Sequence, residues 1–426
     1  MTVDFPYSGY EAIAPAEVPD ANVLGVFAPR AVIDVDEEAI LARAMANPIG
    51  APHLRDAVRS GNRVLVLVDD ATRGTPLPRV LRYVIAELEA AGVADDHVTL
   101  LTAQGTHRRM TDAELQAKLG RYYGRFTIQQ HDWLDEAGLH DFGHTSDGTP
   151  VRANRLVATA DFVLGIGAIV PHRIMGFSGG AKIAFPGVAG QEIQARSQWE
   201  AAHQRSGAIM GRPANAMRHR IEEAARLAGL RYIVNVVTDR EGYIVGSVAG
   251  DPVLAHRAGC RLSADINEAR LPHRADIVLA DSHPADRDLW QSAKGFYSGD
   301  LAVRDNGTLI VVSPNPEGVA QRHSIMLQLG YRPFPEIARL VENRAVTDVV
   351  GAAVLLDLTQ IVDRVDCILV SPGIRRDEAE RLGFRFAPTP QDALTMAFER
   401  QGATARVAVL RYGGRILPRI DDAREN

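Results

Sequence analysis

Two polar loops in the first half of the chain carry residues that could do chemistry, and each follows an apolar run. The loop at 69–76 contains Asp70 and Arg73, and the loop at 104–108 contains His107. An arginine at a strand end can bind a carboxylate or a phosphate through two parallel hydrogen bonds. Histidine is the side chain best suited to proton transfer near neutral pH. The loops therefore predict anion binding and acid–base chemistry, and the alternative is a loop salt bridge with a structural histidine.

The segment 165–190, GIGAIVPHRIMGFSGGAKIAFPGVAG, adds a second histidine, His172, and an isolated lysine, Lys182. If His172 and His107 flank one pocket, they could exchange protons with both faces of a substrate carbon. Lys182 could be a phosphate ligand, a nucleophile activated by desolvation, or a covalent anchor. The alternative is a lysine that lays its stem on apolar surface. The turn between them allows close approach of a ligand to the backbone; its residues are Ser178, Gly179 and Gly180.

A third group of residues lies in the second half of the chain, at Trp290, Gln291 and Lys294. Their spacing places all three on one face of a helix. That face could close over a ligand held by the first half of the chain. The alternative is a solvated helix with one buried tryptophan.

The elements that must position these residues follow a repeated order of apolar strand, polar loop and amphipathic helix. In the first half we expect strands at 63–68, 97–103 and 231–238, and helices at 78–91 and 215–229. In the second half we expect strands at 275–281, 307–313, 365–371 and 406–410, and helices near 317–329, 333–343, 375–382 and 390–401. Such alternation predicts an α/β fold with mostly parallel sheets, in which ligands bind beyond the carboxyl ends of the strands.

The pattern breaks at 271–274 (LPHR), where we expect a domain boundary. We predict an N-terminal domain at 1–268 that carries the cofactor and the catalytic residues, and a C-terminal α/β domain at 269–426. A cleft would separate them, and a hinge near 265–274 would bring Lys294 onto the loops of the first domain.

Composition excludes several classes of protein. The 426 residues carry a formal net charge of −6, which argues against nucleic-acid binding. No apolar run is long enough to span a membrane, and the N-terminus does not resemble a signal peptide. Two distant cysteines exclude a disulfide framework, so a reducing cytoplasm is the expected location. Neither a P-loop nor a complete GxGxxG is present, which disfavours a conventional dehydrogenase.

Together these motifs resemble the nickel-dependent lactate racemase family over roughly residues 10–415. The resemblance rests on DDATRGTP (69–76), GTHR (105–108), PHRIMGFSGGAKIAFPGVAG (171–190), WQSAKG (290–295) and the region of APTPQDAL (387–394). It implies a racemase or epimerase that moves the hydrogen of C2 in a 2-hydroxy acid as a hydride, reversibly.

The resemblance also implies a cofactor, the nickel pincer nucleotide, which is a nicotinate-derived mononucleotide with sulfur donors for nickel. Lys182 matches the family lysine that binds it covalently. His107 and His172 match the acid and base, and Arg73 matches the arginine that holds the substrate carboxylate. The implied cofactor-binding residues are Asp70, Thr72, Ser178, Gly179, Gly180 and Lys182, and the implied substrate-binding residues of the second domain are Trp290, Gln291 and Lys294.

The sequence departs from the family pattern at two positions. Gln198 stands where the family has a nickel-binding histidine, and an amide oxygen is a poorer ligand for nickel than imidazole. His203, five residues further on, is the alternative ligand. Trp290 stands where the family commonly has a tyrosine. An alternative function follows: a homologue that binds a hydroxy acid, a sugar acid or a nucleotide without nickel-dependent turnover. The sequence leaves the oligomeric state open.

Overall fold

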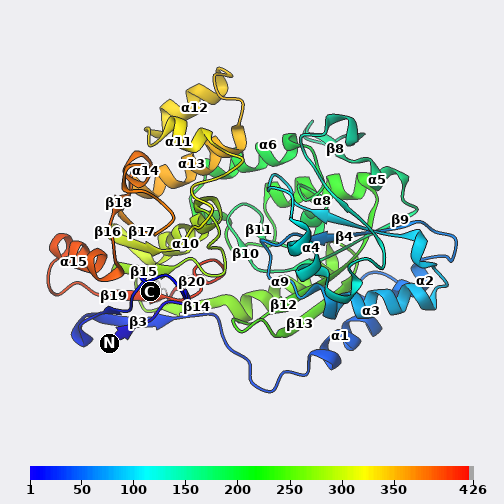
Figure 1. The fold of residues 1–426 in the computed structure, drawn as a ribbon, viewed down its shortest axis with the longest axis horizontal. Coiled ribbons are helices and arrows are strands. Elements are labelled where there is room, and N and C mark those ends of the chain that lie inside the picture. Colours follow the sequence, from blue (N-terminus) through cyan, green and yellow to red (C-terminus); the bar gives the residue numbers. More distant parts are fainter. Residues whose placement is uncertain (422–426) are drawn as a thin grey trace, which may run out of the picture. The chain divides into compact units, whose positions relative to one another are not determined.

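The computed structural model describes residues 1–421 and divides into two compact units (Figure 1). The central unit consists of Ala31–Ser197 and Gly211–Ile266. The terminal unit consists of Met1–Arg30, Gln198–Met210 and the chain from Asn267 onward. The division after Ile266 lies close to the predicted boundary. However, the predicted domain 1–268 wrongly includes the first 30 residues, because strand β3 (Val23–Phe27) pairs with strand β19 (Val407–Leu410) in the sheet of the terminal unit.

The central unit is built on a sheet of six strands whose order reverses in the middle. The order is β13 (Ile244–Gly250), β12 (Leu230–Thr238), β9 (Phe162–Ala168), β4 (Val64–Asp69), β5 (Val98–Ala103) and β6 (Thr127–Gln130). All neighbours are parallel except β13, which is antiparallel to β12. The chain builds β5 and β6 on one side of β4, then returns to place β9 on the other. Ligands bind at such a reversal in open α/β sheets.

Two helices of the central unit have ends that match signals in the sequence. Helix α4 (Asp112–Leu119) opens with a capping box between Thr111 and Glu114, and α8 (Ala216–Ala228) ends at Gly229 in a left-handed conformation. The buried face of α3 (Leu77–Ala90) packs on the completely buried strand β4 and its neighbours. The other elements include α1 (Glu37–Ala46), α2 (Leu54–Ala57), α5 (Arg155–Thr159), β7 (Leu139–His144), β8 (Pro150–Asn154), β10 (Pro171–His172) and β11 (Gly176–Phe177). Helices α6 (Gln191–Ala202) and α9 (Leu254–Asn267) begin in this unit and end with residues of the terminal unit.

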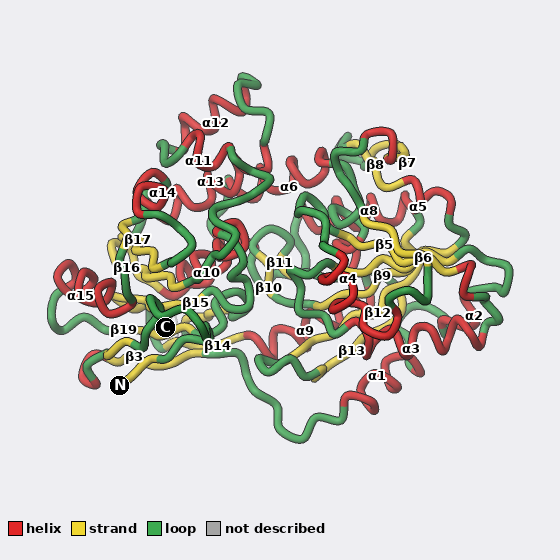
Figure 2. Tube along the Cα trace, viewed as in Figure 1, coloured by secondary structure: helices red, strands yellow, loops and turns green. Residues whose placement is uncertain are grey.

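The terminal unit has a second sheet of six strands, all parallel. Its strands are drawn in yellow in Figure 2. Its order is β18 (Arg385–Phe386), β17 (Asp366–Val370), β16 (Val303–Val312), β15 (Ala275–Asp281), β19 and β3. The predicted fold class, α/β with mostly parallel sheets in two parts, is therefore confirmed. The helices are α7 (Ser206–Ile209), α10 (Leu289–Ala302), α11 (Ile325–Leu329), α12 (Phe334–Glu342), α13 (Val349–Val362), α14 (Arg376–Arg381) and α15 (Pro390–Gln401), and the short strands are β1 (Thr2–Val3), β2 (Ala16–Glu17), β14 (Glu268–Leu271) and β20 (Leu417–Ile420).

Two helices of the terminal unit differ from the sequence prediction. The helix expected at 317–329 covers only α11, and a loop precedes it. Helix α13 was not predicted, because it is apolar on nearly every side and shows no helical period; almost all of it is buried. The predicted hinge near 265–274 contains β14, which pairs in parallel with β20. Among residues 1–421, no helix is long and apolar enough to cross a membrane.

Candidate functional site

Asp70 and His107 form a hydrogen-bonded pair at the carboxyl ends of β4 and β5. The distance from His107 Nδ1 to Asp70 Oδ2 is 2.6 Å. Asp70 is 2% exposed, and its other oxygen accepts from the backbone and the hydroxyl of Thr72 at 2.9 and 2.5 Å. Burial raises the pKa of Asp70, but the charges and hydrogen bonds of His107, Arg73 and Thr72 outweigh it and hold that pKa well below its usual range. An ionised Asp70 accepts only, so His107 Nδ1 must donate and the neutral ring carries its lone pair on Nε2.

His172 has the opposite arrangement of ring nitrogens. It lies in the short strand β10, just after β9, and is half-buried. Its Nδ1 accepts from the backbone N–H groups of Ile174 at 3.2 Å and Met175 at 3.4 Å. The neutral ring must then carry its proton on Nε2. The two histidines therefore present different nitrogen chemistry, a lone pair in one ring and an N–H in the other.

Lys182 has a strongly altered acidity. Burial and, to a smaller extent, the charges of Arg73 and Arg218 lower the pKa of its ammonium to about 7, against the opposing charge of Asp70. The residue lies in a single turn of 3-10 helix, Gly180–Ile183, after the Ser178–Gly180 turn. Its amine is thus neutral in part at pH 7 and able to act as a nucleophile. These electrostatic interactions also show that the structure brings Asp70, Arg73, His107 and Lys182 together at the reversal between β4 and β9.

The turn before Lys182 is held by buried side chains that sequence reasoning missed. Arg218, which is fully buried, donates to the carbonyl oxygens of Met175 at 3.3 Å and Gly179 at 3.1 Å, and also to that of Phe177. His256 Nε2 lies 2.9 Å from the carbonyl oxygen of Ser178. A charged residue on the apolar face of the predicted helix at 215–229 was the available signal for Arg218.

Close contacts with neighbouring protein atoms explain why glycines occupy this turn. Asn235 Oδ1 accepts from the N–H of Gly180 at 2.7 Å, and a Cβ on Gly180 would lie 2.7 Å from the ring of His256. A Cβ on Gly179, where φ is +74°, would meet Ile169 at 2.7 Å. The Ser178 hydroxyl donates to the carbonyl oxygen of Ala168 at 2.7 Å. The phosphate cradle predicted at 178–180 stays a prediction, because packing alone accounts for both glycines and the serine hydroxyl already has a partner.

The loop that carries Arg73 is held by Lys118 of α4. The Lys118 Nζ donates to the carbonyl oxygen of Arg73 at 2.6 Å and lies 2.9 Å from Asp69 Oδ1. Asp69 in turn accepts from the hydroxyl of Thr75. These contacts fix the backbone of the 70–76 loop, so Arg73 starts from a defined position. Sequence reasoning missed Lys118, since a lysine near the end of a short helix is also typical of a solvated position.

Trp290, Gln291 and Lys294 lie on the first turns of α10 in the terminal unit. The Lys294 Nζ donates to Gln291 Oε1 at 2.7 Å, as expected for residues three apart on one helical face. Asp288 caps the helix by accepting from the N–H of Gln291 at 2.8 Å. Their predicted closure over the first domain stays a prediction.

The two predicted metal ligands differ in their surroundings. Gln198 is 9% exposed, and its Oε1 is buried without a hydrogen-bond partner among residues 1–421. His203 is exposed; its Nδ1 lies 2.7 Å from the carbonyl oxygen of Trp199, and its ring packs edge-on against Trp199 and Phe334. In the part of the chain that the structure describes, no three His, Cys, Asp or Glu residues form a metal-binding group.

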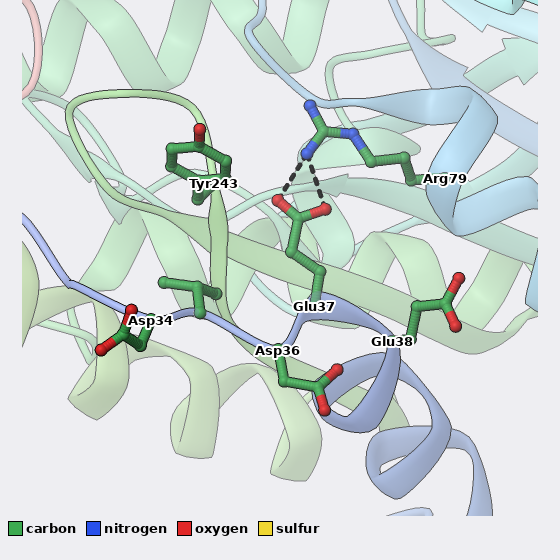
Figure 3. A pocket seen from close by; sticks show the side chains of 7 residues that line it. Asp34, Asp36, Glu37, Glu38, Arg79 and Tyr243 are labelled. Carbon is green, nitrogen blue, oxygen red and sulfur yellow. Dashed lines mark hydrogen bonds and ion pairs between the residues drawn. The ribbon is translucent and has the colours of Figure 1, made fainter.

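A cavity of about 510 Å³ elsewhere in the central unit contains none of the predicted site residues (Figure 3). Asp34, Asp36, Glu37, Glu38, Arg79 and Tyr243 line it, together with Val35. Arg79 bonds both oxygens of Glu37, and Asp36 caps helix α1. Asp36, Glu37 and Glu38 therefore have structural partners, the last of them Arg82 at 2.7 Å.

The site and the fold define a class of protein: an α/β protein with a histidine–aspartate pair, an arginine and a low-pKa lysine at the reversal point of a parallel sheet. Models of the lactate racemase N-terminal domain and of the lactate racemase C-terminal domain match residues 10–207 and 271–417. The chain belongs to the lactate racemase family, whose named members are isomerases.

Individual relatives agree with this assignment. The lactate racemase of Thermoanaerobacterium thermosaccharolyticum is 30% identical over 325 residues, covering 74% of this chain and 75% of the relative. The lactate racemase of Lactiplantibacillus plantarum is 26% identical over 97% of this chain and 98% of its own length. The solved lactate racemase apoprotein from T. thermosaccharolyticum superposes with a TM-score of 0.87 at 26% identity, covering 98% of this chain and 100% of that one. A Thermotoga maritima protein shares the fold, with a TM-score of 0.74 at 21% identity over 91% of this chain and 99% of its own.

Proposed function

We propose that the chain is a racemase or epimerase of a 2-hydroxy acid that uses a nickel pincer nucleotide bound covalently to Lys182. The observation that carries the proposal is the Asp70–His107 pair beside a lysine whose pKa is about 7. Acid–base chemistry needs the first, and covalent attachment of a cofactor needs the second. The names of the curated relatives support the reaction class.

The residues present fit such a cofactor. Lys182 has the neutral amine that a covalent link requires. Gln198 offers a buried carboxamide oxygen that has no hydrogen-bond partner among residues 1–421, and sulfur donors would come from the cofactor itself. An oxygen is a harder and weaker donor to nickel than imidazole, so we expect metal to bind with lower affinity than at a histidine. When bound, this group would supply a hydride acceptor for C2 of the substrate.

The side chains of the central unit would then handle the proton and the carboxylate. His107, oriented by Asp70, would take the hydroxyl proton on Nε2. His172, whose Nε2 carries a proton in the neutral ring, would donate a hydrogen bond to the substrate oxygen. The proton that His107 takes would return to the same oxygen when the hydrogen returns to C2, so the reaction leaves no net change in protonation. Arg73 would hold the carboxylate through its guanidinium fork, and Lys294 with Gln291 would add contacts from the terminal unit.

The test follows C2 stereochemistry. Protein made in a host that synthesises the cofactor is incubated with single enantiomers of a panel of 2-hydroxy acids, and chiral chromatography measures inversion. We expect inversion of at least one acid, abolished by His107→Ala and by His172→Ala. No inversion of any acid, with the cofactor shown to be bound, would exclude the proposal.

A second candidate function is binding without turnover, and Gln198 is the residue that favours it. Such a homologue would bind a hydroxy acid, a sugar acid or a nucleotide without nickel. Intact-mass analysis distinguishes the two, because the proposed enzyme gains mass at Lys182 and binds nickel. An unmodified Lys182 with no nickel favours the second candidate. A cytoplasmic location, and the expectation of no nucleic-acid or membrane partner, are part of both proposals.

A further inference from the structure

A buried histidine of the terminal unit stacks against the predicted substrate-binding tryptophan. The rings of His323 and Trp290 lie 4.1 Å apart between centroids, with an interplanar angle of 13°. His323 belongs to the loop between β16 and α11, and its side chain is 4% exposed. Sequence reasoning assigned no role to it.

The loop that carries His323 runs along the first turn of α10. The N–H groups of Leu289 and Trp290 donate to the carbonyl oxygens of Gly318 and Val319 at 2.9 and 3.0 Å. The same helix presents Lys294 within one turn of Trp290. His323 is therefore part of the structure around the residues proposed to contact the substrate.

Asp348 fixes the state of the His323 ring. Both carboxylate oxygens of Asp348 lie 3.0 Å from His323 Nδ1, so Nδ1 is the donor and the neutral ring carries its lone pair on Nε2. The neutral tautomer is therefore the same as that of His107, whose Nδ1 donates to Asp70. Asp348 Oδ1 also accepts from the N–H of Gly351 at 2.9 Å and caps α13. Helix capping therefore explains the presence of this carboxylate independently of His323.

No contact among residues 1–421 explains why the other ring position of His323 is a nitrogen. Its Nε2 is buried and has no hydrogen-bond partner among residues 1–421. A buried polar atom without a partner costs free energy, and each such atom in a native protein needs an explanation. Stacking on Trp290 does not provide it, because a phenylalanine would stack equally well. The nitrogen is thus suited to a ligand that brings its own hydrogen-bonding group.

We propose that His323 is a specificity-determining residue that binds a hydroxyl group of the substrate beyond C2, so that the preferred ligand is a dihydroxy or polyhydroxy acid. A hydroxyl can donate to the Nε2 lone pair of the neutral ring and can accept from the N–H of the charged ring. This inference rests on the proposed function for the location of the substrate, and it deepens that function by naming the substrate class.

The test uses two pairs of acids that differ by one hydroxyl. Lactate is compared with glycerate, and 2-hydroxybutanoate with 2,4-dihydroxybutanoate, which places the extra hydroxyl one carbon further away. Titration calorimetry measures binding to the cofactor-loaded protein, and chiral chromatography measures inversion at C2. In at least one pair we expect the hydroxylated acid to bind about 10-fold or more tightly, as a satisfied buried partner predicts.

The variants separate recognition from folding. His323→Phe keeps the ring on Trp290 but loses the nitrogen, and we expect it to bind both acids of a pair equally. His323→Gln restores a polar group and should recover part of the discrimination. His273→Gln, at an exposed histidine of the same unit, is the matched control and should bind as the unchanged protein does. Thermal unfolding monitors the fold of each variant.

Several results would overturn the inference. One is the absence of any preference for the hydroxylated acid in either pair, and another is no binding of any of the four acids. A third is a His323→Phe variant that weakens the binding of both acids by the same factor and so keeps the preference for the hydroxylated one. A protein that discriminates through His323 but never inverts C2 would contradict the proposed racemase and leave the recognition by His323 supported.

Discussion

At the scale of single residues, the site is defined by the way partners set the state of each titratable group. Asp70 forces the proton of His107 onto Nδ1, and backbone N–H groups force the proton of His172 onto Nε2. Burial and two guanidinium groups bring the amine of Lys182 into the neutral range. Each effect depends on a specific neighbour, so each can be removed by one substitution.

The first prediction concerns the carboxylate behind His107. Asp70→Asn removes the charge that holds Nδ1 as a donor, so a fraction of the rings will carry the proton on Nε2 instead. We expect kcat for C2 inversion to fall by about 10²- to 10⁴-fold, with KM changed less. Asp34→Asn, at an acid lining the cavity in Figure 3, is the control and should keep full activity. A kcat within threefold of the original for Asp70→Asn would show that Asp70 does not orient the base.

The second prediction concerns pH. A lysine pKa lowered to about 7 means that the protonated form is lost as pH rises through 7, whereas an ordinary lysine stays protonated until about pH 10. Competitive acetylation of the cofactor-free protein, read by peptide mass spectrometry, should give a half-maximal rate at Lys182 near pH 7. Removing a repulsive charge with Arg73→Ala should move that midpoint upward, and Arg79→Ala should not. A midpoint near 10 in the unchanged protein would contradict the prediction.

At the scale of elements, the candidate site residues of the central unit lie in loops and short segments after strands, and neighbouring elements hold these through hydrogen bonds. Lys118 of α4 fixes the backbone of Arg73, and Arg218 of α8 binds three carbonyl groups of the segment before Lys182. The N–H of Gly105 donates to the carbonyl oxygen of Gly187 at 2.8 Å and joins the loop of His107 to the segment of Lys182. Contacts of this kind hold the groups of a site in place before a reaction begins. No conformational entropy is then lost in ordering them during the reaction.

The third prediction concerns the close packing of the segment before Lys182, which contains Gly176. Gly176 has φ of +73°, and a Cβ there would lie 1.8 Å from the carbonyl oxygen of Arg212. Gly176→Ala should therefore lower the free energy of unfolding by more than about 3 kcal/mol, through strain and the steric clash together. Gly148 has φ of +77° but no atom within 4 Å of its Cβ, so Gly148→Ala should cost only about 1–2 kcal/mol. Urea denaturation measures both, and equal losses would contradict the steric explanation.

At the scale of the whole molecule, each of the two discontinuous units is built on its own mostly parallel sheet. The reversal in the central sheet places the loop after β4 beside the loop after β9, which brings Arg73 and Lys182 together. The sheet of the terminal unit begins with β3, from the N-terminal 30 residues. Val3, Ile13 and Val18 from the same segment are buried in the core of that unit.

The fourth prediction follows from that discontinuity. Deletion of residues 2–30 removes β3, so β19 becomes an edge strand. It also removes apolar side chains from the hydrophobic core against which β19 packs. Hydrogen exchange read by mass spectrometry should show faster exchange in β19, while β4 and β9 stay protected. Loss of protection in β4, or unchanged protection in β19, would contradict the assignment of the N-terminal segment to the terminal unit.

Much of this fold could be predicted from sequence because local patterns determine local structure. The β-branched run at 64–68 forms a buried strand, and Thr111 with Glu114 forms the predicted capping box. Helix α13 could not be predicted in this way, because a helix that is buried on all sides shows no polar period. The N-terminal strand could not be assigned to its sheet, since pairing with β19 joins residues almost 400 positions apart.

For the site, the sequence by itself determined which residue types stand at the strand ends: Asp70, Arg73, His107, His172 and Lys182. Only the tertiary structure decided their states and their support. The pKa of Lys182 depends on the charges of Arg73 and Arg218, which folding brings near it from distant positions. The His323 nitrogen that has no partner among residues 1–421 likewise becomes visible only when its neighbours in the fold are known. Acidity and hydrogen bonding depend on distance in space, which a linear sequence does not contain.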